Sequence, residues 1–367
     1  MQTTALHALH QELGGKLVDF AGWELPVHFS GGIAEHQHTR TAASLFDVSH
    51  MGQVLVRPTS GQVADAAAAL ETLIPASIVG LAPWRQRYGL FTSADGGVLD
   101  DLMVANHSTH FFLVVNAART EHDLAHLRGL AGVEVEHLTD RSLLALQGPR
   151  AEGALSELIP EATGLVFMDS VKLGWDGTEI WVSRSGYTGE DGFEISLPNE
   201  RAEEFARRLL DIDGVAPAGL GARDSLRLEA GMPLYGHDLT EDINPVEAGL
   251  AFAIPKVRRS GGSRAGGFPG ADVILPLLDT GTPRERVGLR AEGRAPVRDG
   301  APLFASAESD EQIAVVTSGG FGPSVGGPIA MAMLPRGTAG TVYAEVRGKR
   351  LPLSVTDLPF IPHQYKR

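Results

Sequence analysis

The spacing of apolar residues along the chain alternates between a helical period and short strand-like runs. Leu6, Leu9 and Leu13 fall near helical spacing, and Gly14-Gly15 ends that run. Similar spacing predicts helices over 33–43, 63–73, 119–130, 151–158, 200–210 and 222–231. Short apolar runs predict strands over 16–20, 53–56, 88–92, 98–105, 111–116, 143–146, 180–183 and 193–197. Because strands and helices interleave without a regular βαβ repeat, the pattern predicts an α+β fold.

The pattern changes after residue 255. Residues 256–283 include the Gly-rich, basic stretch PKVRRSGGSRAGGFPG, which is typical of a linker or mobile loop. Beyond it, short strands separated by Gly and Pro are predicted over 286–290, 313–317, 329–334 and 344–346. We therefore expect three parts: residues 1–255, a basic linker over 256–283, and a mostly β module over 284–367.

Composition excludes several classes of protein. The chain of 367 residues carries 31 Lys and Arg against 45 Asp and Glu, a net charge of −14. Nucleic-acid binding depends on a basic balance, so we expect no nucleic-acid partner. The absence of Cys excludes disulfides, thiol nucleophiles and zinc–cysteine sites. No apolar run of about 18 residues and no secretory leader are present, so we expect no membrane association and a cytoplasmic location.

Searches for common catalytic motifs find none. The chain has no G-x-x-x-x-G-K-[ST] phosphate loop, no G-x-G-x-x-G after a strand, and no G-x-S-x-G elbow. His36 and His38 stand two residues apart, which places them on different sides of a helix. We interpret them as part of a solvated helix face, and we expect no metal site.

Two adjacent carboxylates stand in an apolar strand. Asp100 and Asp101 lie inside GGVLDDLMV, and ionised groups are costly to bury. Adjacent strand residues point to opposite faces, so one Asp could face the core or a cleft while the other faces solvent. The alternative is an acidic pair near a turn that caps local N–H groups.

Two Gly-rich segments also carry polar side chains. In SRSGYTGEDGFEI (183–195), Gly at every third position allows close approach to a flat or anionic ligand, with Tyr187 and Glu194 at the two ends. The alternative is an ordinary hairpin. In GLGARDSLRLEAGMPLYG (219–236), Arg223 and Arg227 are one helical turn apart, and they could clamp an anion or carbonyl group. The alternative is an ion-pair network with Asp224. Neither segment decides the function by itself.

Together these segments resemble the T-proteins of the glycine cleavage system, which are tetrahydrofolate-dependent aminomethyltransferases. Further matching segments are LVDFAGWELPVHF (17–29), LFDVSHMG (45–52), VVNAAR (114–119), ALQGPRA (145–151), NPVEAGL (244–250) and VTSGGFGPSVGGPIAMAML (316–334). The resemblance runs nearly end to end. It implies a three-lobed folate-binding fold, with two intertwined α+β lobes in residues 1–255 and a C-terminal β-barrel in residues 284–367.

The resemblance also implies roles for individual residues. Asp101 would be the catalytic acid or base beside the reactive nitrogens of the pterin, and it would also contact the folate. Glu194 would pair with the amino and ring N–H groups of the pterin, and Arg223 would add a second polar contact. The other implied folate-pocket residues are Met51, Tyr88, Val115, Asn116 and Tyr187. Their chemistry fits, because a carboxylate accepts two adjacent donors and aromatic or Met side chains suit a flat ring.

The implied reaction starts from an aminomethyl group on the lipoyl arm of a partner H-protein. Its one-carbon unit passes to tetrahydrofolate, which is the acceptor substrate, and the products are 5,10-methylene-tetrahydrofolate, ammonia and dihydrolipoyl H-protein. One alternative is a tetrahydrofolate-dependent demethylase of a small methylated substrate. A second is a non-enzymatic folate-binding protein of iron–sulfur cluster assembly, but the signature of that protein centres on a Cys, which this chain lacks.

Two basic segments have no role in this resemblance. Arg258, Arg259 and Arg264 could form a basic rim for the glutamate tail of folate or for an acidic carrier protein. The alternative is a solvated linker. Lys366 and Arg367 are the candidates for a C-terminal cation near the folate.

Overall fold

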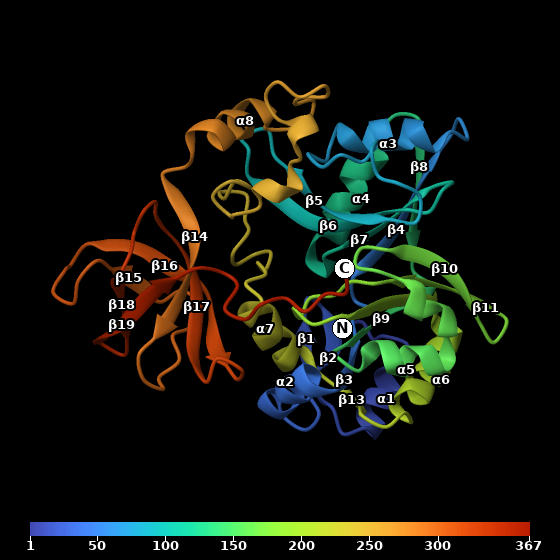
Figure 1. Cartoon of the computed structure of the whole chain (residues 1–367), viewed down its shortest axis with the longest axis horizontal. Coiled ribbons are helices and arrows are strands. Elements are labelled where there is room, and N and C mark those ends of the chain that lie inside the picture. Colours follow the sequence, from blue (N-terminus) through green and yellow to red (C-terminus); the bar gives the residue numbers. More distant parts are fainter.

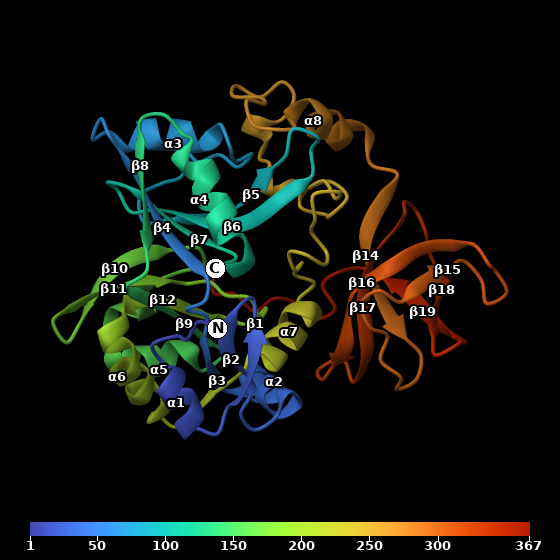
Figure 2. The same ribbon diagram turned by 180° about the vertical axis from the view of Figure 1, so that it is seen from behind.

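The computed structural model describes all 367 residues and arranges them in three lobes (Figure 1). Two lobes lie against each other, and the third, a β-barrel, stands to one side; Figure 2 shows the same arrangement from behind. The mixture of helices with four separate strand systems confirms the predicted α+β class. None of the helices has the length and apolar composition needed to cross a membrane.

The first lobe is built on a six-stranded sheet. The strand order is β10 (Ser170–Trp175), β11 (Thr178–Ser183), β12 (Gly192–Pro198), β9 (Arg141–Gln147), β3 (Ala43–Asp47) and β13 (Val215–Pro217). Both faces are buried, since Leu144 and Leu146 of β9 join one apolar cluster while Leu143 and Ala145 join another. The flanking helices are α1 (His7–Glu12), α5 (Ala151–Leu158) and α6 (Asn199–Leu210) on one side, and α2 (Gly32–Thr41) and α7 (Leu220–Glu229) elsewhere on the lobe. The hairpin of β1 (Lys16–Phe20) and β2 (Trp23–His28) packs beside α7.

The second lobe is inserted in the sequence of the first. Its five-stranded antiparallel sheet has the order β5 (Gln86–Thr92), β6 (Val98–Asn106), β7 (Phe111–Val115), β4 (Gly52–Pro58) and β8 (Val133–Leu138). Helices α3 (Val63–Glu71) and α4 (Thr120–Arg128) cover one face, and the other face meets the first lobe around Phe112 and Trp181. The chain crosses between the lobes more than once, as expected for intertwined lobes.

Residues 256–283 pack against the second lobe. They contain a 3-10 turn at Lys256–Arg258 and helix α8 (Ala271–Thr280). Arg258 is only 4% exposed, and its guanidinium donates to the carbonyl oxygen of Glu71 at 2.7 Å. Arg264 pairs with the Glu71 carboxylate at 3.0 Å, and Arg259 donates to the carbonyl oxygens of Ile254 and Ala251. The interpretation of these arginines as a free basic rim is therefore wrong, because their charges are used inside the fold.

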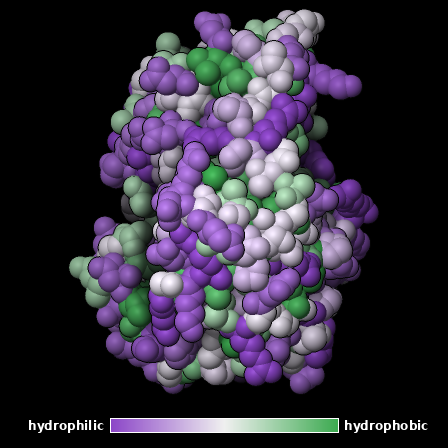
Figure 3. Space-filling model, turned by 90° about the vertical axis from the view of Figure 1, so that its left-hand side faces the viewer, coloured by the Kyte–Doolittle hydropathy of each residue, from purple (hydrophilic) through white to green (hydrophobic).

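The third lobe is a closed barrel. Its strands, in order around the barrel, are β14 (Arg284–Ala291), β17 (Gly327–Pro335), β16 (Gln312–Gly322), β15 (Pro302–Phe304), β18 (Thr341–Val346) and β19 (Lys349–Thr356). Its outer end shows a mostly hydrophilic surface with scattered apolar atoms (Figure 3). After β19 the chain returns to the first lobe, where Gln364 N–H donates to the Gly189 carbonyl and Lys366 pairs with Glu152 at 2.7 Å. Lys366 is thus engaged in a surface ion pair on the first lobe.

Helix α7 joins the first lobe to the barrel through a buried ionic cluster. Glu229 of α7 accepts hydrogen bonds from His36 and Arg40 of α2, each at 3.0 Å, and from the backbone N–H of Ser324 in the barrel. His36 is 0% exposed, so the expectation that it belongs to a solvated helix face is wrong. Its second ring nitrogen contacts Ser225 Oγ at 2.7 Å. No three His, Cys, Asp or Glu side chains are arranged to hold a metal ion.

Candidate functional site

Strand β6 sends Asp100 and Asp101 to opposite faces of the second-lobe sheet. Asp100 is 0% exposed and lies on the face covered by α4, together with Leu102 and Val104. Asp101 is half-buried and lies on the face directed at the first lobe, as does Ala105. Neither Asp faces open solvent, so the predicted split between the two faces holds but the solvent-facing partner does not exist. Asp100 accepts the backbone N–H of Asn116 at 3.2 Å.

Asp101 is fixed in place by two hydrogen bonds. The Tyr88 hydroxyl, from the neighbouring strand β5, donates to Oδ2 at 3.0 Å. The Asn116 side-chain amide, from the end of β7, donates to Oδ1 at 2.8 Å. The same amide also donates to Oδ1 of Asp100 at 2.8 Å, so Asn116 joins the two carboxyl groups. The structure therefore brings three of the predicted residues into direct contact.

Burial raises the pKa of Asp101 to about 7, and the nearby negative charge of Asp100 adds to this rise. The hydrogen bonds from Tyr88 and Asn116 act in the opposite direction, because they favour the charged carboxylate. Near neutral pH, Asp101 is therefore present in both protonation states. A carboxyl group with this property can both accept and return a proton during one reaction.

The first lobe supplies the opposite wall of the site. Arg223, near the start of α7, holds its guanidinium 4.9 Å from the centre of the Tyr187 ring and 3.8 Å from the sulfur of Met51. Arg223 makes no ion pair. Burial lowers the pKa of its guanidinium, and the negative charge of Glu194 partly offsets this effect. Since a buried guanidinium normally has carboxylate or carbonyl partners, Arg223 has donors left for a ligand.

Tyr187 lies in the loop that joins β11 to β12, and Glu194 lies on β12 beside that loop. Ser185 donates to Oε2 of Glu194 at 2.6 Å, while Oε1 accepts no hydrogen bond within the protein. The Tyr187 hydroxyl donates to the carbonyl oxygen of Pro233. Gly186, just before Tyr187, leaves room for the Gln147 side chain, because a Cβ there would lie 1.8 Å from the side-chain oxygen of Gln147. The loop and the start of β12 thus present an aromatic ring and a half-free carboxylate near Arg223.

Arg227 has a structural role that differs from the role of Arg223. Its guanidinium pairs with Asp224 at 2.7 Å and with the fully buried Asp238 at 3.0 Å. Asp238 also accepts a hydrogen bond from Ser318 of the barrel at 2.7 Å. The ion-pair alternative therefore applies to Arg227, and only Arg223 is left free to bind a ligand.

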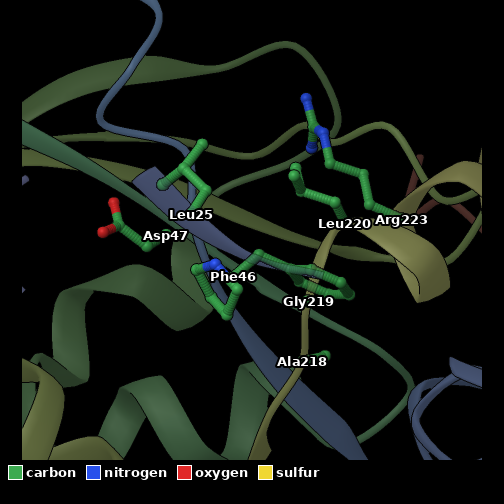
Figure 4. Close-up of a pocket in the computed structure, with 8 residues that line it drawn as sticks. Leu25, Phe46, Asp47, Ala218, Gly219, Leu220 and Arg223 are labelled. Carbon is green, nitrogen blue, oxygen red and sulfur yellow. The ribbon is translucent and has the colours of Figure 1, made fainter. Parts of the chain in front are cut away.

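A small cavity lies behind this wall (Figure 4). It has a volume of about 10 Å³, which is room for about one water molecule. It is lined by Leu25, Pro26, Phe46, Asp47, Ala218, Gly219, Leu220 and Arg223. The figure shows the Arg223 side chain extending from α7 away from Phe46 and Asp47. This cavity is too small for an organic ligand, so the candidate site is instead the group of half-buried side chains that includes Asp101, Tyr187, Glu194 and Arg223.

One predicted pocket residue is placed differently. Val115 is 0% exposed and belongs to the core beneath α3 and α4, on the side of the sheet away from the first lobe. Its neighbour Val114 is half-buried and packs on the side of the first lobe, near Met51. The side chain that packs against the first lobe is therefore Val114. The other predicted pocket residues are all half-buried: Met51, Tyr88, Asp101, Asn116, Tyr187, Glu194 and Arg223.

The sequence did not reveal two residues next to this site. Phe252 is 68% exposed, and its ring stacks on Tyr88 with 5.8 Å between the ring centres. It lies two residues beyond the NPVEAGL motif, in an apolar stretch that resembles ordinary core. Asp123 of α4 is 0% exposed and lies behind Asp100. The sequence showed only a Phe in an apolar stretch and an Asp in a predicted helical first turn.

Comparisons with known proteins agree along the whole chain. Residues 6–258 match a family model described as the GCVT N-terminal domain, and residues 284–361 match the glycine cleavage T-protein C-terminal barrel domain. The chain is 39% identical to the mitochondrial aminomethyltransferase of Dictyostelium discoideum, covering 100% of this chain and 94% of the relative. It is 40% identical to the aminomethyltransferase of Rubrobacter xylanophilus, covering 98% and 94%.

A solved structure shows the same fold. The glycine cleavage system aminomethyltransferase T of Bartonella henselae superposes with a TM-score of 0.92 at 40% sequence identity, and the match covers 100% of this chain and 99% of that one. The fold implied by the sequence resemblance is therefore confirmed. The chain belongs to the glycine cleavage T-protein family of aminomethyltransferases.

Proposed function

We propose that this chain transfers a one-carbon unit from the aminomethyl-lipoyl arm of an H-protein to tetrahydrofolate. The observation that carries this proposal is Asp101, whose carboxyl is fixed by Tyr88 and Asn116 and has its pKa raised to about 7. It faces a wall with a free guanidinium at Arg223 and a half-free carboxylate at Glu194. Membership of an enzyme family with full-length aminomethyltransferase relatives supports the same activity.

The wall around Arg223 fits a pterin ring. The amide edge of a pterin carries N–H donors beside a carbonyl acceptor, and Oε1 of Glu194 and the guanidinium of Arg223 complement those groups. The Tyr187 ring and the Met51 thioether offer apolar contact to the flat faces of the ring. These four residues would thus orient the folate with its reactive nitrogens toward Asp101.

Asp101 would serve the proton transfers of the reaction. The carrier R–S–CH2–NH2 and tetrahydrofolate give methylene-tetrahydrofolate, ammonia and R–SH, so the C–N bond and the C–S bond of the carrier break while two C–N bonds to folate form. The two protons lost from the folate nitrogens end on ammonia and on sulfur. A carboxyl that populates both protonation states near pH 7 can move a proton from nitrogen to the leaving amine, a role with an effect of about 10²- to 10⁴-fold.

Relatives of this chain differ in their cellular location. Curated relatives include mitochondrial enzymes and bacterial enzymes. The assignment of this chain to the cytoplasm stays a prediction.

The activity is tested by ammonia release from aminomethyl-lipoyl H-protein, measured with and without tetrahydrofolate. We expect folate-dependent release by the wild type and its loss in Asp101→Asn. Asp95→Asn is the matched control, because Asp95 is exposed on the turn between β5 and β6. Folate affinity is measured in parallel by direct binding. Folate binding without ammonia release by the wild type would reject the aminomethyl donor, and small methylated donors would then be tested.

A further inference from the structure

We propose that Arg40 is a positioning residue for the Tyr187 ring: it ties the loop that carries this ring (residues 184–191) to the carboxylate of Glu229, and through Glu229 to the barrel. Folate binding and attachment of the barrel are then coupled, although every residue assigned to the site lies outside the barrel. This inference rests on the proposed function for its ligand, tetrahydrofolate.

Arg40 stands in the last turn of α2 and holds its guanidinium between two buried carboxylates. Nη1 donates to Oε1 of Glu190 at 2.9 Å, and Nη2 donates to Oε2 of Glu229 at 3.0 Å. Nη1 also donates to the carbonyl oxygen of Thr188 at 2.7 Å. The Glu190 and Glu229 side chains are 6% and 0% exposed. Because a guanidinium is planar and rigid, Arg40 fixes the position of Glu190 relative to Glu229.

The contacts of Arg40 with the 184–191 loop lie directly beside Tyr187. Arg40 bonds to Thr188 and Glu190, and Thr188 follows Tyr187 in the chain. The Tyr187 ring lies with its centre 4.9 Å from the guanidinium carbon of Arg223. Since Thr188 is covalently joined to Tyr187, a displacement of the Thr188 carbonyl changes where the ring lies against Arg223.

Two further contacts hold the loop in place. The Thr188 hydroxyl donates to Oε1 of Gln147 at 2.8 Å, and the Gln364 N–H donates to the carbonyl oxygen of Gly189 at 2.8 Å. Both are hydrogen bonds between neutral groups, whereas the bonds from Arg40 are charge-assisted and therefore stronger. We expect loss of Arg40 to displace the loop without detaching it from the first lobe.

Glu229 continues this connection to the barrel. Its Oε1 accepts the backbone N–H groups of Ser324 at 2.7 Å and Val325 at 3.2 Å, in the turn between β16 and β17. Its Oε2 accepts from Arg40 and from His36, each at 3.0 Å. Helices α2 and α7 lie side by side, and the barrel packs against α7 (Figure 1). One carboxylate therefore joins the cation that holds the loop to the turn that attaches the barrel.

A carboxylate shared in this way makes the two attachments depend on each other. Removing a cation from a buried carboxylate leaves its charge uncompensated, which is strongly unfavourable. A ligand that fixes the Tyr187 ring favours the loop position in which Arg40 reaches both carboxylates. By linkage the same ligand favours the attached barrel, and the attached barrel favours the ligand by the same factor.

The affinity for tetrahydrofolate is the first measurement, taken as the Kd by calorimetry with the full-length protein. We expect Arg40→Leu to weaken binding by about 5- to 50-fold, within the usual range for coupling between two sites. KM for tetrahydrofolate should rise with the Kd. We expect kcat to stay within about threefold, because Asp101 and its donors Tyr88 and Asn116 belong to the second lobe.

Two other variants separate the role of Arg40 from general effects of losing an arginine. Arg40→Lys keeps the charge but lacks the planar fork, so its affinity should lie between those of the wild type and Arg40→Leu. Arg207→Leu is the matched control, since Arg207 also pairs with two carboxylates, those of Glu12 and Glu203, on the surface of the first lobe. It should bind tetrahydrofolate as the wild type does.

Barrel attachment is the second measurement, taken as hydrogen–deuterium exchange of the peptide that contains Ser324 and Val325. In the wild type, we expect saturating tetrahydrofolate to slow exchange of these two amides by about threefold or more. In Arg40→Leu the same saturating ligand should leave their exchange unchanged. This measurement requires no turnover.

A purely structural role of Arg40 gives a different result. Arg40→Leu would then have a lower melting temperature but wild-type affinity below it, which overturns the inference. Exchange of the Ser324 and Val325 amides that folate does not slow in the wild type also overturns it. If Arg40→Leu does not fold, Arg40→Lys decides, because wild-type affinity in that variant overturns the inference and a loss of about twofold or more supports it.

The proposed function is decided separately. A wild type that binds tetrahydrofolate but releases no ammonia rejects that function, while the affinities and the exchange rates still decide the role of Arg40. Folate-dependent ammonia release together with wild-type affinity in Arg40→Leu rejects the coupling alone. A wild type that does not bind tetrahydrofolate overturns both.

Discussion

Asp100 and Asp101 are neighbours in strand β6, yet their carboxyls lie on opposite faces of the sheet and are joined only through the amide of Asn116. The half-buried Asp101 faces the space between the two lobes, and the fully buried Asp100 lies beneath α4. Because the protein interior screens charge poorly, the negative charge of Asp100 raises the proton affinity of the Asp101 carboxyl. The pair therefore combines an accessible acid–base group with a fixed charge that adjusts it.

The first prediction concerns the pH dependence of turnover. Because burial and the charge of Asp100 raise the pKa of Asp101 to about 7, a step that needs deprotonated Asp101 should have its acid midpoint near that pH. In Asp100→Asn the like charge is gone, so the midpoint should move to lower pH by about one unit. The measurement is kcat against pH with saturating substrates. An Asp100→Asn profile with its midpoint at the wild-type pH would contradict the proposed coupling.

Most of the fold and the site residues could be predicted because they lie in local motifs. The alternation in VLDDLMV identifies a strand with two carboxyls on opposite faces, and the helices after residues 119, 150 and 199 follow from apolar spacing. Which face of β7 meets the first lobe depends on strand pairing across the sheet. Val115 was therefore expected in the pocket although Val114 occupies that side.

Contacts between distant segments could not be predicted. Asp123 stands in the first turn of a helix, where an acidic residue is explained by the helix dipole alone, yet the fold buries it completely. Arg258 and Arg264 were expected in a solvated linker, but their partner Glu71 is far away in the sequence. His36 is buried for the same reason, since Glu229 lies on another helix. A single sequence contains no signal for such pairings.

The second prediction concerns folate affinity. Arg223 has no carboxylate or carbonyl partner in the protein, so its guanidinium should bond to the folate ring. Arg223→Ala should weaken tetrahydrofolate binding by about 10- to 100-fold, the range for one hydrogen bond to a charged group. The measurement is the Kd by calorimetry. Arg128→Ala, an exposed arginine of α4, is the control and should bind as the wild type does. Equal affinity of the Arg223→Ala variant would place the ring elsewhere.

The third prediction concerns Phe252 at the mouth of the site. Its ring is 68% exposed and stacks on Tyr88, which in turn holds Asp101. Phe252→Ala should raise KM for tetrahydrofolate by about 2- to 10-fold, because an aromatic contact contributes about 0.5–1.5 kcal/mol. Phe252→Tyr keeps the ring and should keep KM. Since the side chain is exposed, the melting temperature should be unchanged in both variants. An increase of KM in Phe252→Tyr equal to that of Phe252→Ala would argue against ring contact.

The last prediction concerns the ionic cluster between α7 and the barrel. Burial opposes the charge of Glu229, but hydrogen bonds from His36, Ser324 and Arg40 outweigh it and lower the pKa of Glu229 from 4.5 to about 2. A lowered pKa stabilises the folded state above the unfolded value of 4.5, and this stability is lost as the pH falls toward about 2.

Glu229→Gln should therefore destabilise the protein at pH 7 by about 3–5 kcal/mol, since His36 and Arg40 lose a buried partner. The difference from the wild type should shrink as the pH falls below 4.5, where the wild-type advantage is titrated away. Denaturant unfolding at pH 7 and at a pH below 4.5 measures the difference in the free energy of unfolding between the two proteins. Glu285→Gln on β14 serves as a control outside the cluster. A destabilisation independent of pH would mean that Glu229 acts through packing, because only its charge makes the contribution depend on pH.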